Sequence, residues 1–132
     1  MGVVRILIAD DEPHIRRVLE LKLQGAGYDV RATSSGKEAL AAAQEYLPHL
    51  VISDYKMPGD MTGVDLVLAL RKIPDTLDTP IILLTGSVAV LHKLQDILGG
   101  IPQVTIQSKP FSPRTLLQQV KEILEDKPIE KP

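Results

Sequence analysis

Three carboxylates and one ammonium group in this sequence each stand directly after a hydrophobic run. They belong to Asp10, Asp11, Asp54 and Lys109. Carboxylate oxygens are the ligands that Mg²⁺ prefers, and a carboxylate can also accept a phosphoryl group to form an aspartyl phosphate. A lysine beside them supplies a point charge for phosphoryl oxygens. If the fold brings these side chains together, they would form a site for a hard cation and a phosphoryl group.

The elements that must position these residues follow an alternating pattern. Apolar runs alternate with amphipathic segments, which is typical of βαβ units around a parallel sheet. The pattern predicts strands near 4–9, 29–32, 50–54, 81–85 and 103–108, with a helix after each. In an open α/β sheet the carboxyl ends of the strands face one crevice, where ligands bind. We therefore expect an α/β fold with a doubly wound five-stranded parallel sheet, five flanking helices and three layers, and a site at that crevice.

Local signals also predict helix ends and helix faces. Pro13 suits the first turn of a helix, where its missing N–H costs nothing. Ser35 followed by Glu38 predicts a capping box at the start of the next helix. In the helix expected over 88–98, the side chains expected to face inward are Val90, Leu91, Leu94, Ile97 and Leu98.

Composition limits the classes of protein to consider. The chain has 132 residues, a formal charge of -2, 3% aromatic residues and no cysteine. A thiolate metal site is excluded, and nothing favours direct nucleic-acid binding. The apolar runs are too short for membrane insertion and no signal peptide is evident, so we expect a cytoplasmic protein. Residues 1–125 suit one domain, and 126–132 suit a flexible tail or the start of a linker.

Each candidate residue has a simpler explanation when taken alone. Asp10 or Asp11 could cap a helix, and Asp54 could bond to nearby backbone groups in a loop. Thr85 is an ordinary strand residue, and Lys109 could be a solvated strand end. Their joint occurrence, in this order and at strand ends, favours a functional site.

The motifs resemble those of the receiver domain of two-component response regulators, chemotaxis-regulator-like proteins included. The matching segments are Asp10-Asp11, Asp54-Tyr55-Lys56-Met57-Pro58 and Lys109-Pro110-Phe111. The resemblance extends from residue 3 to about 125. It implies a flavodoxin-like sheet with strand order 2-1-3-4-5 and phosphorylation at Asp54.

The resemblance also implies roles for the neighbouring residues in metal binding. Asp11 and Asp54 would bind Mg²⁺ directly, and Asp10 would act through water. The main-chain carbonyl of Lys56 would be a further ligand.

The resemblance implies that two catalytic residues, Thr85 and Lys109, would contact the phosphoryl group. Gly86 would leave the approach open. The bond between Lys109 and Pro110 would be cis, which would aim the lysine inward.

The function implied is that of a phosphoacceptor in phosphorelay signal transduction. A histidine kinase or His-containing phosphotransfer protein would donate the phosphoryl group to Asp54 in a Mg²⁺-dependent reaction. The domain would catalyse only its own phosphorylation and dephosphorylation, so it is not an enzyme acting on other substrates. Phosphorylation would switch binding to a downstream protein partner or act on a missing output domain.

Three features depart from the family pattern. Ile106 stands where many receivers carry Tyr or Phe, the loop over 57–63 is one residue longer than the common form, and 99–103 replaces the usual lead into the fifth strand. Ile106 leaves an alternative open, namely a phosphorylation-independent receiver-like module that binds proteins. A phosphatase with an aspartyl nucleophile is disfavoured, because Lys56 occupies the position of its second Asp.

Overall fold

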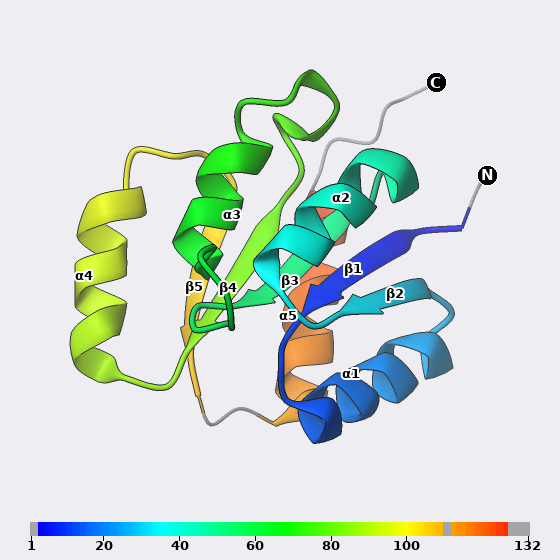
Figure 1. Ribbon diagram of the computed structural model, residues 1–132. Helices are drawn as coiled ribbons and strands as arrows, with labels where there is room; N and C mark the ends of the chain where they lie inside the picture. The colour runs from blue at the N-terminus through cyan, green and yellow to red at the C-terminus, as the bar shows by residue number, and fades with distance from the viewer. Residues whose placement is uncertain (1–2, 110–111, 127–132) are drawn as a thin grey trace.

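The computed structural model describes residues 3–109 and 112–126, in which strands and helices alternate (Figure 1). The strands are β1 (Arg5–Ala9), β2 (Asp29–Thr33), β3 (Leu50–Asp54), β4 (Ile81–Thr85) and β5 (Val104–Ser108). The helices are α1 (Pro13–Gly25), α2 (Gly36–Tyr46), α3 (Gly63–Leu70), α4 (Val88–Leu98) and α5 (Pro113–Asp126), with a short 3₁₀ helix η1 (Pro74–Thr76). All strand pairs are parallel and their order is β2-β1-β3-β4-β5, which confirms the expected fold.

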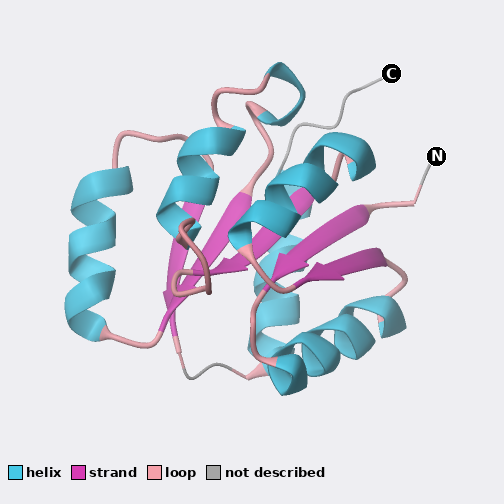
Figure 2. Ribbon diagram, in the orientation of Figure 1, coloured by secondary structure: helices cyan, strands magenta, loops and turns pink. Residues whose placement is uncertain are grey.

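The sheet lies between two layers of helices, with α2, α3 and α4 on one face and α1 and α5 on the other (Figures 1 and 2). Side chains alternate along each strand, so Leu7 and Val51 pack toward the first layer while Ile6 and Ile52 pack toward the second. Every residue of β3 and β4 is buried. These central strands are apolar up to Ile52 and Leu84 because helices cover both of their faces.

The helix caps agree with the sequence patterns except at one carboxylate. The Ser35 side chain accepts a hydrogen bond from the Glu38 N–H, as predicted. The Glu38 carboxylate, however, accepts from the N–H and hydroxyl of Ser34 at 2.7 and 3.1 Å, so the predicted capping box was wrong. Ser34 donates two hydrogen bonds to one oxygen of this carboxylate, whereas the capping box would have offered only one, from the Ser35 N–H. A reciprocal capping box does occur at Thr62 and Asp65, where none was predicted.

Helix α4 occupies its predicted range but buries a narrower stripe than expected. Leu94 and Leu98 are buried, whereas Ile97 is 52% exposed, so its predicted inward position was wrong. The helix packs mainly against β5, the edge strand of the sheet. An edge strand leaves the outer flank of the helix uncovered, and Ile97 lies on that flank.

The unusual connection between α4 and β5 is tied to the C-terminal end of α3. Ile101 packs against the core, and Gln103 adopts a left-handed backbone with φ of 61°. The guanidinium of Arg71 donates to the main-chain oxygens of Thr76 and Pro102 at 3.0 and 3.1 Å. A single arginine therefore joins three connecting segments at the amino-terminal ends of β4 and β5.

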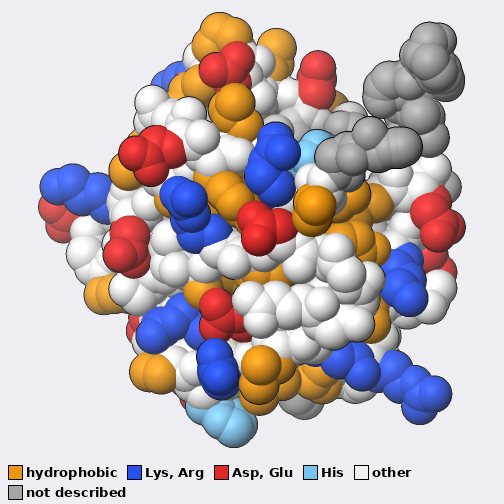
Figure 3. Space-filling view, turned by 90° about the vertical axis from the view of Figure 1, so that its right-hand side faces the viewer, with side chains coloured by type: hydrophobic (Ala, Val, Ile, Leu, Met, Phe, Trp, Pro, Cys, Tyr) orange, Lys and Arg blue, Asp and Glu red, His pale blue; other side chains and the backbone are white. Residues whose placement is uncertain are grey.

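The surface carries charges of both signs. Figure 3, which views the side of the molecule that carries β2, shows basic and acidic side chains interspersed with apolar ones. In the described part of the chain, no helix combines the length and apolar character needed to cross a membrane. Of the expected tail 126–132, Asp126 belongs to α5, whereas residues 127–132 and the predicted cis bond at Pro110 lie outside the described residues.

Candidate functional site

The strand order places four chemistry-bearing residues side by side. Strands β1, β3, β4 and β5 are neighbours, and their carboxyl ends lie within one residue of each other in register: Ala9 pairs with Ser53, Asp54 with Leu84 and Thr85 with Ser108. Asp10 directly follows β1, Asp54 and Thr85 end β3 and β4, and Lys109 directly follows β5. Parallel strands bring these ends to one edge of the sheet, as the sequence predicted.

The three carboxylates form a cluster of oxygen atoms. Asp10, Asp11 and Asp54 each offer one carboxylate oxygen, and these oxygens lie within 4.8 Å of one another. Asp10 is 1% exposed and Asp54 is 8% exposed, while Asp11 is exposed at the rim. The cluster is therefore closed on the protein side and open on the solvent side.

Asp10 is held in place at both its main chain and its side chain. Its N–H donates to Thr33 O at 3.1 Å, and its Oδ1 accepts from the Glu12 N–H at 2.9 Å. Its Oδ2 is buried and has no hydrogen-bond partner within the described part of the chain. A buried carboxylate oxygen without a partner is costly, and a bound cation would remove that cost.

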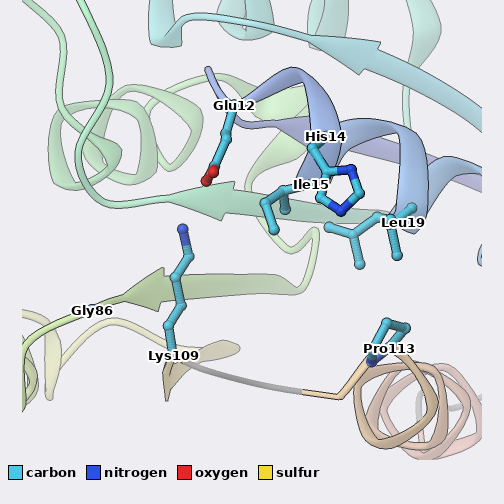
Figure 4. Close-up of a pocket in the computed structure, with 8 residues that line it drawn as sticks. Glu12, His14, Ile15, Leu19, Gly86, Lys109 and Pro113 are labelled. Carbon is cyan, nitrogen blue, oxygen red and sulfur yellow. The ribbon is translucent and has the colours of Figure 1, made fainter.

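The ammonium group of Lys109 lies beside the carboxylates. Its Nζ is 3.2 Å from Asp54 Oδ2 and 3.9 Å from Asp10 Oδ2. The Lys109 N–H donates to Thr85 O at 2.7 Å, which fixes the backbone from which the side chain departs. Figure 4 shows the side chain extending from the end of β5 toward the side of the site occupied by Glu12. Lys109 is thus an inward-directed cation and not a solvated strand end.

The electrostatics of the site are those of crowded, desolvated carboxylates. Burial raises the pKa of Asp54, and the nearby Lys109 ammonium only partly offsets this rise. Burial also raises the pKa of Asp10, and the negative charge of Asp54 adds to that effect while the Glu12 N–H opposes it. Both residues would ionise more readily with a cation bound, because opposite charge favours the carboxylate form.

A pocket of about 210 Å³ opens directly over Asp54. It is lined by Asp54, Tyr55, Lys56, Thr85, Gly86, Ser87 and Val90. The Thr85 hydroxyl accepts a hydrogen bond from the Ser87 N–H at 3.3 Å. A Cβ added at Gly86 would meet no atom within 4 Å, so the approach beside Gly86 is open. The pocket leaves room for a tetrahedral group between Asp54 and Thr85.

A second pocket, of about 500 Å³, lies on the other side of Lys109 (Figure 4). Ile15 and Leu19 of α1 form its apolar wall opposite Pro113 at the start of α5, and Glu12 points into the space toward Lys109. The site is therefore flanked by a hollow between α1 and α5.

Gly63 supports Asp54 in a way that the sequence did not reveal. Its N–H donates to Tyr55 O at 2.8 Å. A Cβ at this position would lie 2.5 Å from Asp54 O, 2.6 Å from Leu83 Cδ1 and 2.9 Å from Tyr55 Cα. Only glycine allows α3 to begin this close to Asp54. In the sequence, Gly63 cannot be told from the nearby loop residue Gly59, which is glycine for another reason: its φ of 89° is a backbone conformation that other residues rarely adopt.

Ile106 lies in the middle of β5, as the sequence predicted, and pairs with Leu83. Its side chain is half-buried and packs on the face covered by α2, α3 and α4. It lines a pocket of about 260 Å³ together with Leu98 and Val104. The position expected to hold an aromatic ring is therefore filled by an aliphatic side chain beside α4.

The sequence and fold are similar to those of known signalling proteins. The family model "Response regulator receiver domain" matches residues 6–121. The chemotaxis response regulator CheY4 of Vibrio cholerae is 36% identical, with a TM-score of 0.81 over 92% of this chain and 99% of that one.

Longer regulators are also similar to this chain. The DNA-binding response regulator MtrA of Mycolicibacterium smegmatis is 33% identical over 96% of this chain and 54% of its own length. The phosphate regulon transcriptional regulatory protein PhoB of Pseudomonas aeruginosa is 35% identical over 90% and 51%. The chain thus spans about half the length of these curated relatives. From the family match and the parallel 2-1-3-4-5 fold together, the chain belongs to the response regulator receiver domains, the signalling domains of two-component systems.

Proposed function

We propose that this receiver domain is a phosphoacceptor in which Asp54 takes a phosphoryl group in a Mg²⁺-dependent reaction. One observation carries the proposal: the Asp54 carboxylate lies 3.2 Å from the Lys109 ammonium and belongs to a cluster with Asp10, whose buried Oδ2 has no hydrogen bond among the described residues. A nucleophile, a cation for the incoming oxygens and a site for a metal ion thus meet at one edge of the sheet.

Receiver domains bind Mg²⁺ at an acidic pocket, and the residues of this cluster fit that ion. Its donors are all oxygens, and the open side of the cluster admits the waters that Mg²⁺ retains. Asp11 and Asp54 would hold the ion directly, Asp10 would hold it through water, and Lys56 would add its main-chain carbonyl. When bound, the ion supplies positive charge that offsets the charge of the transferring phosphoryl group.

The transfer itself would proceed by in-line displacement at phosphorus. A carboxylate oxygen of Asp54 forms the new P–O bond as the P–N bond of a donor phosphohistidine breaks. The electron pair of the broken bond stays on the imidazole nitrogen, which then takes a proton from solvent. The Lys109 ammonium and the Thr85 hydroxyl bind the phosphoryl oxygens, which is the positioning and charge stabilisation that this chemistry requires.

Removal of the phosphoryl group would also occur within the domain. Water attacks the phosphorus of the aspartyl phosphate, which restores the Asp54 carboxylate and releases inorganic phosphate. Lys56 and Ser87 line the pocket above Asp54 and would set how easily water enters. No second carboxylate two residues after Asp54 serves as a general acid, so we propose catalysis of self-modification only.

The partners follow from the same chemistry. A histidine kinase or His-containing phosphotransfer protein in the cytoplasm would donate the phosphoryl group. The group would shift an existing equilibrium between surface states, by no more than its difference in binding to those states. The output would be a protein partner, or a further domain of the kind implied by the name of MtrA, a DNA-binding response regulator. Residues 1–125 would form the receiver, and 126–132 would lead away from it.

The test is the intact mass of the protein after exposure to acetyl phosphate with and without Mg²⁺. The parent should gain one phosphoryl group only when Mg²⁺ is present, and Asp54→Asn should gain none. Asp60→Asn is the matched control, because Asp60 is an exposed carboxylate of the neighbouring loop, and it should react like the parent. An adduct on Asp54→Asn equal to that of the parent would contradict the proposal.

One observation favours a second function. Ile106 cannot move as an aromatic ring would, which leaves the readout of phosphorylation without its usual ring. If the parent binds Mg²⁺ by calorimetry but forms no adduct under any condition, the domain would instead be a phosphorylation-independent protein-binding module.

A further inference from the structure

We infer that Arg16 is the positioning residue that orients the Asp10-Asp11 pair toward the metal. This inference rests on the proposed function, because it concerns how the same site is held ready. Arg16 belongs to α1 and does not touch the reacting groups. It acts through the main chain of Asp10.

The contact is a hydrogen bond from a charged donor to a main-chain acceptor. Arg16 Nη1 donates to the carbonyl oxygen of Asp10 at 2.9 Å. The Arg16 backbone is itself fixed, since its N–H donates to Glu12 O at 3.0 Å in the first turn of α1. A half-buried guanidinium on a rigid helix thus holds the loop that carries the two carboxylates.

The contact completes the set of restraints on Asp10. Its N–H is bonded to Thr33 O, and its Oδ1 is bonded to the Glu12 N–H. With the carbonyl held by Arg16, the Asp10 atom left without a hydrogen bond among the described residues is Oδ2, the buried oxygen that lies 3.9 Å from the Lys109 ammonium. The Asp10 carbonyl and the Asp11 N–H belong to the same planar peptide, so fixing one also fixes where the Asp11 side chain begins.

The charge of Arg16 also acts on a carboxylate in the first turn of α2. Hydrogen bonds from Ser34 are the main cause that lowers the pKa of Glu38, and the positive charge of Arg16 adds a smaller contribution. The charge of Arg16 is therefore also felt at the N-terminus of α2. The planar guanidinium carries several N–H donors that point in different fixed directions, whereas the ammonium of a lysine is a compact point charge.

Arg17 provides a matched control on the same helix. It is the adjacent residue, and its side chain is 68% exposed. It faces Glu20 of its own helix, with 3.8 Å between Nη1 and Oε1. Replacing Arg17 removes the same charge from the helix without touching the Asp10 carbonyl.

The experiment compares Arg16→Met, Arg16→Lys and Arg17→Met with the parent by calorimetric titration with Mg²⁺. We expect Arg16→Met to bind Mg²⁺ roughly tenfold more weakly, the lower end of the loss seen for residues that orient metal ligands. Arg16→Lys should recover part of the loss, because it can still donate one hydrogen bond. Arg17→Met should match the parent, and equal affinities for Arg16→Met and the parent would overturn the inference.

A second readout needs no metal. In ¹⁵N–¹H correlation spectra of the Mg²⁺-free protein, Arg16→Met should shift the amide signals of Asp11 and Glu12 strongly. These signals report the peptide that Arg16 holds and the hydrogen bond to Asp10 Oδ1. Unshifted Asp11 and Glu12 signals in a folded variant would contradict the inference. If the parent binds no Mg²⁺ and forms no adduct, the proposed function fails, yet these amide signals still decide the role of Arg16.

Discussion

Replacing Gly63 with alanine should destabilise the protein, although a glycine-to-alanine change at the start of a helix is usually stabilising. Gly63 is the first residue of α3 and its φ is not positive, so an alanine there meets no backbone strain. By reduced entropy of the unfolded chain alone, such a change stabilises a protein by about 0.4–1 kcal/mol.

The surroundings of Gly63 reverse that expectation. An added Cβ would lie 2.5 Å from Asp54 O and 2.9 Å from Tyr55 Cα, both of them backbone atoms of the site. Backbone cannot yield as the end of a flexible side chain can, so we take the upper part of the range for overpacking, about 3 kcal/mol. Less the entropic gain, the free energy of unfolding should fall by about 2–3 kcal/mol, which lowers the Tm by roughly 10 °C.

Thermal and urea unfolding of Gly63→Ala would measure this loss. Gly25→Ala is the matched control, because Gly25 is the last residue of α1 and a Cβ there meets nothing within 4 Å. That variant should be as stable as the parent or slightly more stable. Adduct formation should also slow in Gly63→Ala, since relief of the clash moves Asp54. Unchanged or increased stability of Gly63→Ala would refute the argument for close approach.

Three further predictions follow from other contacts. Burial raises the pKa of Asp54, so its charged form destabilises the fold above that pKa. Without Mg²⁺, Asp54→Asn should therefore raise the free energy of unfolding at pH 7. Urea titrations should show this gain in stability shrinking as the pH falls through the raised pKa of Asp54. A gain in stability that does not depend on pH would contradict this prediction. Arg71→Met should lower the free energy of unfolding by about 2 kcal/mol, because hydrogen bonds such as that to Pro102 O are lost. The amide hydrogens just before β5 should then exchange faster with solvent, and unchanged exchange would contradict a stabilising role of Arg71 in this connection. Leu98→Ala should lower the free energy of unfolding by about 2–4 kcal/mol and Ile97→Ala by less than about 0.5 kcal/mol in thermal unfolding, whereas equal losses would contradict the burial of Leu98 and the exposure of Ile97.

The elements of the fold were largely predictable because their signals are local and strong. The continuous apolar run of β4 and the apolar spacing of α4 predicted bounds that match the structure at both ends. The convergence of Asp10, Asp54 and Lys109 was also predictable, since it depends only on strand ends in a parallel sheet. The strand order needed the family resemblance.

The remaining features depend on which atoms meet across the fold. Ile97 has the spacing of a core residue, but only the position of α4 beside the edge strand explains why its side chain stays about half exposed. Glu38 bonds to Ser34 because that residue offers two donors. The close fit of Gly63 against Asp54 and the hydrogen bond from Arg16 to the Asp10 carbonyl are near in sequence, but they depend on the path of the loops after β3 and β1, which residue types alone do not encode.

Locating the phosphoryl group tests the central claim most directly. Borohydride reduces an aspartyl phosphate to homoserine, so treating the protein after acetyl phosphate and Mg²⁺ would mark the acceptor permanently. Peptide mass spectrometry should then find homoserine at position 54 and an unchanged aspartate at positions 10 and 11. Homoserine at position 11, or at no position although Mg²⁺ is bound, would contradict the assignment of Asp54 as the phosphoacceptor.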